Sequence, residues 1–151
     1  TQSTSRRQRQ MCIRDRYKAA YHDPTKGGSG YWLYPTKSDT APSNDLSPGP
    51  NFANFGEGGD YTLTPGVGYS PITPYLTNVG SFTGSASHYG TYDQGGSVWE
   101  WTESLSGANR EGRGGAWGNG SVHLMGSSSR NDHPSTENSG IGIRVAKPAE
   151  P

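Results

Sequence analysis

Cysteine and large apolar residues are both scarce in this chain. Its 151 residues include a single cysteine, Cys12, and only 28% are hydrophobic. One thiol excludes an intrachain disulfide and a zinc site built from several cysteines. The low hydrophobic fraction, with 23 glycines and 11 prolines, argues against a helical bundle. Four tryptophans and nine tyrosines nevertheless indicate a folded, loop-rich domain, because disordered segments are poor in aromatic residues.

Glycine is absent from the first sixteen residues, which carry five arginines. Their string Arg-Arg-Gln-Arg-Gln-Met-Cys-Ile-Arg-Asp resembles translated sequencing adapter, so we interpret residues 1–16 as a non-native, disordered segment. Residues 17–147 then form the domain, and residues 148–151 begin a C-terminal tail. Five of the thirteen basic and one of the thirteen acidic residues lie in residues 1–16, which leaves eight and twelve, a formal charge of −4. This balance argues against nucleic-acid binding, and no apolar run is long enough to span a membrane.

The stretch from Tyr89 to Trp101 is the densest in the chain: Tyr-Gly-Thr-Tyr-Asp-Gln-Gly-Gly-Ser-Val-Trp-Glu-Trp. The pair Gly95-Gly96 permits positive φ angles, which turn backbone carbonyls inward. The residues that follow alternate with the period of a strand, so Trp99 and Trp101 are expected on one face. The opposite face then receives Val98 and Glu100.

Two interpretations of the carboxylates in this stretch remain open. Asp93, Glu100 and turn carbonyls are hard oxygen donors of the kind that calcium binds six to eight at a time. The alternative is a buried aromatic hairpin in which the two carboxylates only accept hydrogen bonds from backbone N–H groups. The spacing alone does not separate a metal site from such a hairpin.

Three motifs follow one another in the second half of the chain: Gly-Gly-Ser-Val-Trp-Glu-Trp-Thr-Glu (95–103), Arg-Gly-Gly-Ala-Trp (113–117) and Gly-Ile-Arg-Val-Ala (142–146). They resemble the ordered motifs of the formylglycine-generating enzyme, or sulfatase-modifying factor, family, whose usual forms are Gly-Asn-Val-Trp-Glu-Trp, Arg-Gly-Gly-Ser-Trp and Gly-Phe-Arg-Val-Ala. The resemblance covers residues 17–146 and only the C-terminal part of such a domain. It implies an α+β, C-type-lectin-like fold with short strands and much irregular loop.

The resemblance also implies structural calcium (Ca2+). At one site the family uses an Asn side chain and the backbone carbonyl of the next residue. The family also supplies a carboxylate to this site, but here Pro71 or its neighbours stand at that position. Asp60 is the residue that could substitute for this carboxylate. At the other site Ser97 replaces the usual Asn, and a hydroxyl is shorter than an amide. The implied metal ligands are Asn54, Phe55, Asp93, Gly96, Val98 and Glu100.

Copper is not expected. In oxidase members of the family, two cysteines after the Gly-Gly-Ser-Trp/Tyr segment bind copper, since soft thiolates suit copper(I). Here Asn119 stands near the first position and residues 122–125 near the second, so no thiolate is available. The four histidines are scattered without a metal-ligand spacing: His22, His88, His123 and His133.

The sequence therefore predicts a non-catalytic, calcium-stabilised binding or structural module of a bacterial protein. An alternative is a metal-dependent oxidoreductase whose ligands are not cysteines, such as His123, Asp132 and His133, or come from the part of the family domain without a counterpart here. The binding version would recognise a protein, peptide or glycan through exposed tyrosines and tryptophans. The ending Val-Ala-Lys-Pro-Ala-Glu-Pro is similar to the start of a bacterial surface-sorting tail, which favours export to the cell surface.

Local patterns predict a few elements. Residues 17–22 form a short helix that Asp23-Pro24 ends, because the residue before proline disfavours the α region. Residues 31–34 and 59–64 are predicted as short strands. A last strand contains Arg144. Its burial requires a carboxylate or several carbonyls as partners, and Glu100 or Asp132 could supply the carboxylate.

Overall fold

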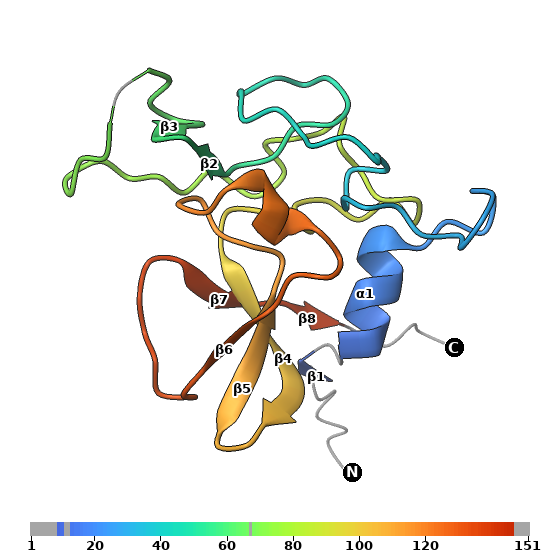
Figure 1. Ribbon diagram of the computed structural model, residues 1–151. Helices are drawn as coiled ribbons and strands as arrows, with labels where there is room; N and C mark the ends of the chain where they lie inside the picture. Colours follow the sequence, from blue (N-terminus) through green and yellow to red (C-terminus); the bar gives the residue numbers. More distant parts are fainter. Residues whose placement is uncertain (1–8, 11–12, 67, 147–151) are drawn as a thin grey trace, which may run out of the picture.

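The computed structural model describes residues 9–10, 13–66 and 68–146 of the chain. One helix and a four-stranded sheet form one half of the domain, and irregular chain forms the other half (Figure 1). The elements in order are β1 (Arg9–Gln10), α1 (Ile13–Tyr21), β2 (Gly56–Glu57), β3 (Asp60–Tyr61), β4 (Trp99–Ser106), β5 (Asn109–Arg113), the 3-10 helix η1 (Ser121–Leu124), β6 (Arg130–Asp132), β7 (Ile141–Ile143) and β8 (Val145–Ala146).

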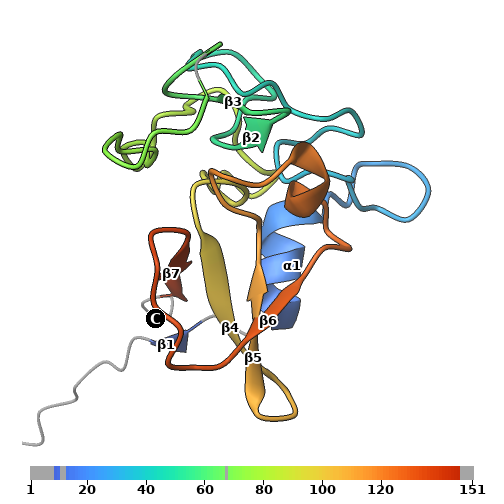
Figure 2. The same cartoon turned by 60° about the vertical axis from the view of Figure 1, so that its left-hand side comes forward.

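The sheet has the strand order β6-β5-β4-β7. Strand β5 runs antiparallel to both β4 and β6, whereas β7 runs parallel to β4. A two-residue turn joins β4 to β5, and its Gly107 has a φ of 62°, which such tight hairpins favour. On β4, Glu100 lies between Arg113 of β5 and Gly142 of β7. The Trp-Glu-Trp motif is thus central in the sheet, and α1 packs against β4 (Figure 2).

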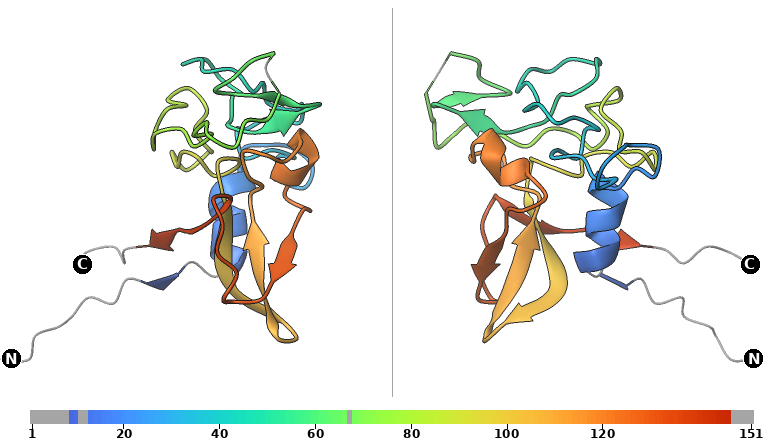
Figure 3. Two further views of the ribbon diagram at one scale, coloured as in Figure 1. Left: turned by 90° about the vertical axis from the view of Figure 1, so that its left-hand side faces the viewer. Right: turned by 45° about the vertical axis from the view of Figure 1, so that its right-hand side comes forward.

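The irregular half spans residues 22–98 (Figure 3). Among the described residues of this segment, β2 and β3 are the only regular strands. Its packing depends on a small cluster of buried side chains: Tyr34, Ala53 and Phe55 from the loops meet Leu124 of η1, with Met125 against them. Because the cluster joins residues from both halves, it holds the loops to the sheet side of the domain.

Helix α1 confirms the predicted helix but begins earlier, at Ile13. The expectation of disorder up to residue 16 is therefore wrong for residues 13–16, and also for residues 9–10, which pair with β8. The physical reason is that Arg16 is buried, 3% exposed, and bonds to the sheet. Residues 1–8, 11–12 and 148–151 lie outside the described residues, and the non-native origin of the N-terminal segment stays a prediction.

Three strand predictions need correction. Residues 31–34 form no strand, because only isolated bridges reach them, and Leu33 is 47% exposed. Of residues 59–64, only Asp60–Tyr61 pair as a strand. The predicted last strand is split at Arg144 into β7 and β8.

Candidate functional site

The chain enters β4 through a turn with unusual backbone angles. Asp93 and Ser97 have φ values of 53° and 62°, and Gly96 has a φ of 81°. The N–H of Val98 donates to the carbonyl of Gly96 at 2.8 Å, which makes a γ-turn of the rare, strained kind with a positive φ at its centre. Residues with side chains hold such angles only where their surroundings impose them, and such residues cluster at functional sites.

Two other segments, the Arg113–Trp117 motif and the loop at Asn54, hold this turn in place. The N–H of Gly96 donates to the carbonyl of Gly114 at 2.7 Å, and the N–H of Ser97 donates to the carbonyl of Asn54 at 2.7 Å. The carbonyl of Ser97 accepts from the N–H of Trp117 at 3.0 Å. A Cβ atom at Gly96 would overlap the Asn54 carbonyl, so this close approach requires glycine. The second sequence motif and the Asn54 loop therefore meet at the strained turn.

A buried carboxylate follows the turn. Glu100 is only 5% exposed and is bonded by two arginines. The Nε of Arg144 donates to its two oxygens at 3.1 and 3.0 Å, and Nη2 donates to Oε1 at 2.9 Å. The Nη1 of Arg16 donates to Oε2. Burial lowers the pKa of the Arg16 guanidinium, and Glu100 opposes this shift.

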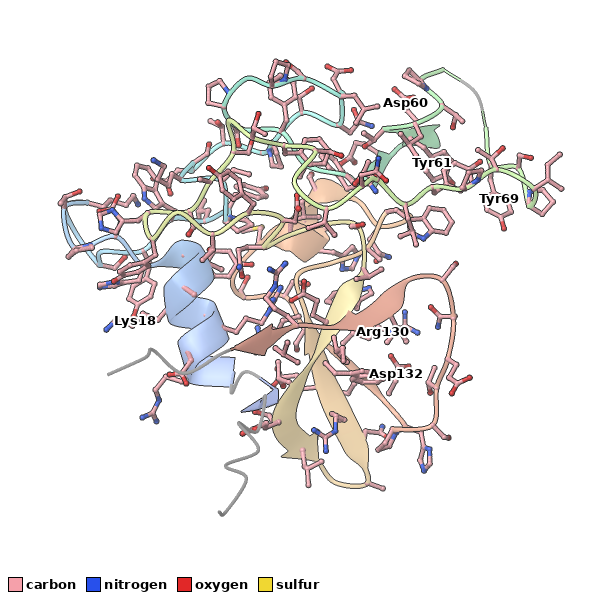
Figure 4. All side chains as sticks on the ribbon, turned by 180° about the vertical axis from the view of Figure 1, so that it is seen from behind. Lys18, Asp60, Tyr61, Tyr69, Arg130 and Asp132 are labelled. Carbon is pink, nitrogen blue, oxygen red and sulfur yellow. The ribbon has the colours of Figure 1, made fainter. Side chains whose placement is uncertain are left out.

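Glu100 is thus the partner of Arg144, one of the two that the sequence suggested. Asp132 instead pairs with Arg130 on the same strand, β6, and Figure 4 shows these two side chains close together there. Arg144 also reaches the strained turn, since its Nη2 donates to the backbone carbonyl of Asp93 at 2.7 Å. One arginine side chain therefore connects the joint between β7 and β8 with the turn and with β4.

A cavity of about 310 Å³ lies beside this cluster. Asp93, Gly96, Val98 and Glu100, which form one of the two ligand sets implied by the sequence, all line it, and residues 143–145 form another part of its wall. The carboxylate of Asp93 is held by the N–H of Gly80, which donates to Oδ2 at 2.6 Å. The structure therefore brings these four positions together.

Asn54 and Phe55 do not line this cavity. The side-chain amide of Asn54, which is 2% exposed, donates to the carbonyl of Tyr75 at 2.8 Å. The carbonyl of Phe55 accepts from the hydroxyl of Thr62 at 3.3 Å. Asp60, the suggested substitute ligand, accepts from the N–H of Gly66 at 2.7 Å. These groups have partners within the loop half, where they serve the packing of the irregular chain.

Comparison with known proteins identifies the family. Residues 19–149 match the sulfatase-modifying factor enzyme 1-like domain. The chain belongs to this family. The fold of this sulfatase-modifying factor enzyme 1-like domain is similar to the structure of PvdO from Pseudomonas aeruginosa, with a TM-score of 0.56 at 23% identity. The similarity covers 95% of this chain and 54% of that chain, so the domain spans about half the length of the solved structure. No curated protein matches the sequence.

In this sulfatase-modifying factor enzyme 1-like domain, Asn119 and Leu124, which lie near the two positions where the family resemblance implies copper-binding cysteines, make structural contacts. The Oδ1 atom of Asn119 accepts from the indole Nε1 of Trp99 at 2.7 Å and from the N–H of Ala116 at 3.1 Å. Trp99 is 3% exposed. Near the second position, Leu124 of η1 is fully buried in the core. Asn119 thus connects β4 to the Arg-Gly-Gly-Ala-Trp turn, a role that the sequence did not indicate.

The four histidines contact other side chains and do not form a shared metal site among the described residues. His22 bonds to the hydroxyl of Tyr89, His88 pairs with Asp23, and His133 bonds to Ser135, while His123 lies edge-on to the ring of Trp99. Across the described residues, no group of three or more His, Cys, Asp or Glu side chains is close enough to hold a metal ion. The set His123, Asp132 and His133 is accordingly not assembled. No helix of the described chain is long and apolar enough to cross a membrane.

The residues that line the cavity include oxygen donors of the kind that calcium binds. Carboxylate and carbonyl oxygens are the donors that calcium prefers, and the cavity is lined by Asp93, Glu100 and two turn residues. The donors suit the ion in kind, but Glu100 already accepts from two guanidinium groups. A carboxylate has about four lone-pair positions, so Glu100 can bind an ion only by releasing an arginine contact. Asp93 and the carbonyls of Gly96 and Val98 are the groups that would hold the ion without that exchange.

Proposed function

We propose that this domain is a non-catalytic, calcium-stabilised structural or binding module of an exported bacterial protein. The observation that supports it best is the meeting of Asp93, Gly96, Val98 and Glu100 at one cavity, beside a strained turn that two other segments hold. An ion at this point would link the loop half to the central strand. Such a link matters in a domain whose buried apolar cluster is small, because metal binding contributes directly to the stability of the folded state.

The occupancy of Glu100 sets the expected affinity. Because two arginines already neutralise this carboxylate, we expect a weak site, with a Kd of about 10⁻⁴–10⁻³ M, the range of extracellular calcium modules. Such a site fills only where calcium is abundant, which agrees with the exported location that the C-terminal sequence suggests. The structural role of the ion and the location are thus parts of one proposal.

A calcium titration tests this proposal. At a calcium concentration ten times the Kd, the ion should stabilise the domain by about 1.4 kcal/mol and raise Tm by roughly 3–6 °C. Asp93→Gly removes the carboxylate while keeping a residue that tolerates the φ of 53°, so the effect of calcium should disappear. Asp45→Gly, at an exposed loop residue far from the cavity lining, is the matched control and should keep the full effect.

Isothermal titration calorimetry and thermal unfolding with and without a chelator give the readout. Absence of any calcium effect at about 10 mM would overturn the calcium role. Oxidation of a thiol substrate after loading with copper or iron, lost in His123→Ala, would establish the oxidoreductase alternative instead.

The binding version of the proposal has a surface to use. In the irregular half, several large apolar side chains are exposed, and the ring of Tyr69, 62% exposed, lies almost parallel to that of Trp117 at 6.2 Å. Figure 4 shows Tyr61 and Tyr69 in this part of the domain. Exposed apolar side chains mark a ligand surface where they form one contiguous patch. The residues are Tyr69, Ile72, Leu76 and Val79.

A further inference from the structure

The guanidinium of Arg144 is a cation that already lies at the cavity. Arg144 contacts both carboxylate oxygens of Glu100, and its Nη2 also donates to the carbonyl of Asp93. These two acidic residues are also two of the proposed calcium ligands. The guanidinium therefore already neutralises the Glu100 carboxylate, which an ion in the cavity would use, whereas at Asp93 it contacts only the backbone. The inference rests on the proposed calcium site and concerns how its affinity is set.

The local charge is balanced without a metal. Arg16 and Arg144 both form ion pairs with the carboxylate of Glu100, and Asp93 lines the same cavity, which gives two positive and two negative charges around it. A divalent ion in the cavity would add two positive charges beside a guanidinium, and such repulsion is strong where water is largely excluded. The carboxylate of Glu100 is 7% exposed as a side chain, so solvent screens it little.

Only one of the two arginines has room to leave. The side chain of Arg16 is 4% exposed, whereas that of Arg144 is 29% exposed. Arg144 also lies at the one-residue joint between β7 and β8 and lines the cavity wall itself. Releasing Arg144 from Glu100 can return its guanidinium to water, which is the favourable medium for a charge that has lost its partner.

We propose that Arg144 is a competitor for calcium at Glu100 and thereby determines the affinity of the site. With Arg144 bonded, Glu100 presents no vacant lone pair to the cavity. When Arg144 moves toward solvent, Glu100 regains oxygen atoms that a divalent cation can bind. Arg144 is a positioning residue in this scheme, since it acts through Glu100 and does not itself bind the ion.

The test is calcium titration calorimetry on the wild type and on Arg144→Met, which keeps the apolar stem and removes the charge. We expect Arg144→Met to bind calcium at least about tenfold more tightly. Arg130→Met is the matched control, because Arg130 pairs with Asp132 on β6 and does not line the cavity. Its calcium affinity should equal that of the wild type.

A second measurement applies if Arg144→Met fails to fold. In the wild type, NMR of the arginine Nε–H groups during a calcium titration should show the Arg144 signal shifting while the Arg130 signal stays in place. Two outcomes would overturn the competition and leave the calcium site intact. In the first, the wild type binds calcium and the Arg144 signal does not move. In the second, the wild type binds calcium and Arg144→Met binds it equally or more weakly. No binding by the wild type or by Arg144→Met at about 10 mM calcium would instead overturn the proposed calcium role, and the competition with it.

Discussion

At the scale of single residues, the turn before β4 stores backbone strain. Ser97 has a φ of 62°, and in this left-handed region a residue with a Cβ atom is disfavoured by roughly 1–2 kcal/mol. Its neighbours hold it there, since its N–H and carbonyl bond to Asn54 and Trp117. The family motif usually has Asn at this position, and Asn tolerates this conformation better than Ser. The serine therefore makes this turn less stable than an asparagine at the same position would.

This strain gives a prediction for Ser97→Gly. The substitution should raise the free energy of unfolding by about 1 kcal/mol, because glycine adopts a positive φ without a steric cost. Ser106→Gly, in the extended strand β4, is the matched control and should lower it by roughly 0.5–1 kcal/mol. Urea denaturation of both variants measures the difference. A loss of stability in Ser97→Gly would show that the serine side chain contributes more than its strain costs.

The glycines of this region show how far the sequence could predict local structure. The pair Gly95-Gly96 was expected to adopt positive φ angles, and Gly96 does, with 81°. Gly95 has no such angle, and the space beside it is filled by the ring of Pro35. A Gly-Gly pair in the sequence indicates a turn. It does not show whether glycine is required by a positive φ angle or by a neighbouring group that leaves no space for a Cβ atom. That distinction depends on which distant segment packs there.

At the scale of elements, β4 is held from several sides. Its Trp99 N–H donates to the carbonyl of Gly140 at 2.7 Å, ahead of the parallel pairing with β7, and its indole bonds to Asn119. The Trp-Glu-Trp motif predicted this strand, whereas the burial of its first residues does not alternate, because Trp99, Glu100 and Thr102 are all buried. The parallel strand β7 and the role of Asn119 were not predictable, because both depend on contacts across long stretches of chain.

Asn119→Ala tests the connection between β4 and the turn that follows β5. The substitution leaves the buried indole N–H of Trp99 and the N–H of Ala116 without their acceptor. We expect the free energy of unfolding to fall by about 1–3 kcal/mol, the usual cost of a buried donor left unpaired. Thermal and urea unfolding measure it, with Asn131→Ala on the exposed side of β6 as the control. Equal, small losses in both variants would contradict the structural role of Asn119.

At the scale of the whole molecule, two titrating groups limit the pH range of stability. Asp23 is bonded by the hydroxyl and N–H of Thr25, by the indole of Trp32 and by His88, and these bonds hold its pKa well below the usual range. Burial raises the pKa of Tyr21 to about 12, while its hydroxyl donates to the carbonyl of Leu124 at 2.8 Å. Tyr21 ties α1 to η1, and Asp23 orders the loop that follows the helix.

The two pKa shifts predict opposite limits. A depressed carboxyl pKa stabilises the fold above the unfolded value of about 4, and this contribution is lost as the pH falls below it. A raised tyrosine pKa contributes fully below about pH 10 and is lost as the pH rises through about 12. The free energy of unfolding should therefore form a plateau between about pH 4 and pH 10.

Urea denaturation across this range checks the plateau. Asp23→Asn should make the acid side less steep, although Asp39 and Glu57, whose pKa values are also lowered by hydrogen bonds, still contribute there. Tyr21→Phe should make the alkaline side less steep, while Asp45→Asn at an exposed loop residue should leave both sides unchanged. An unaltered acid slope in Asp23→Asn would contradict the assignment to Asp23.

The hairpin turn at Gly107 and Ala108 has a practical consequence. Both residues are exposed, and a Cβ atom at Gly107 would meet nothing within 4 Å. The turn lies at the end of β4 remote from Glu100. A fluorophore or a short affinity tag inserted there would leave the carboxylate cluster and the strained turn undisturbed, because tolerant insertion points are exposed loop tips of this kind. The domain can therefore be immobilised through this turn, at the end of β4 opposite Glu100.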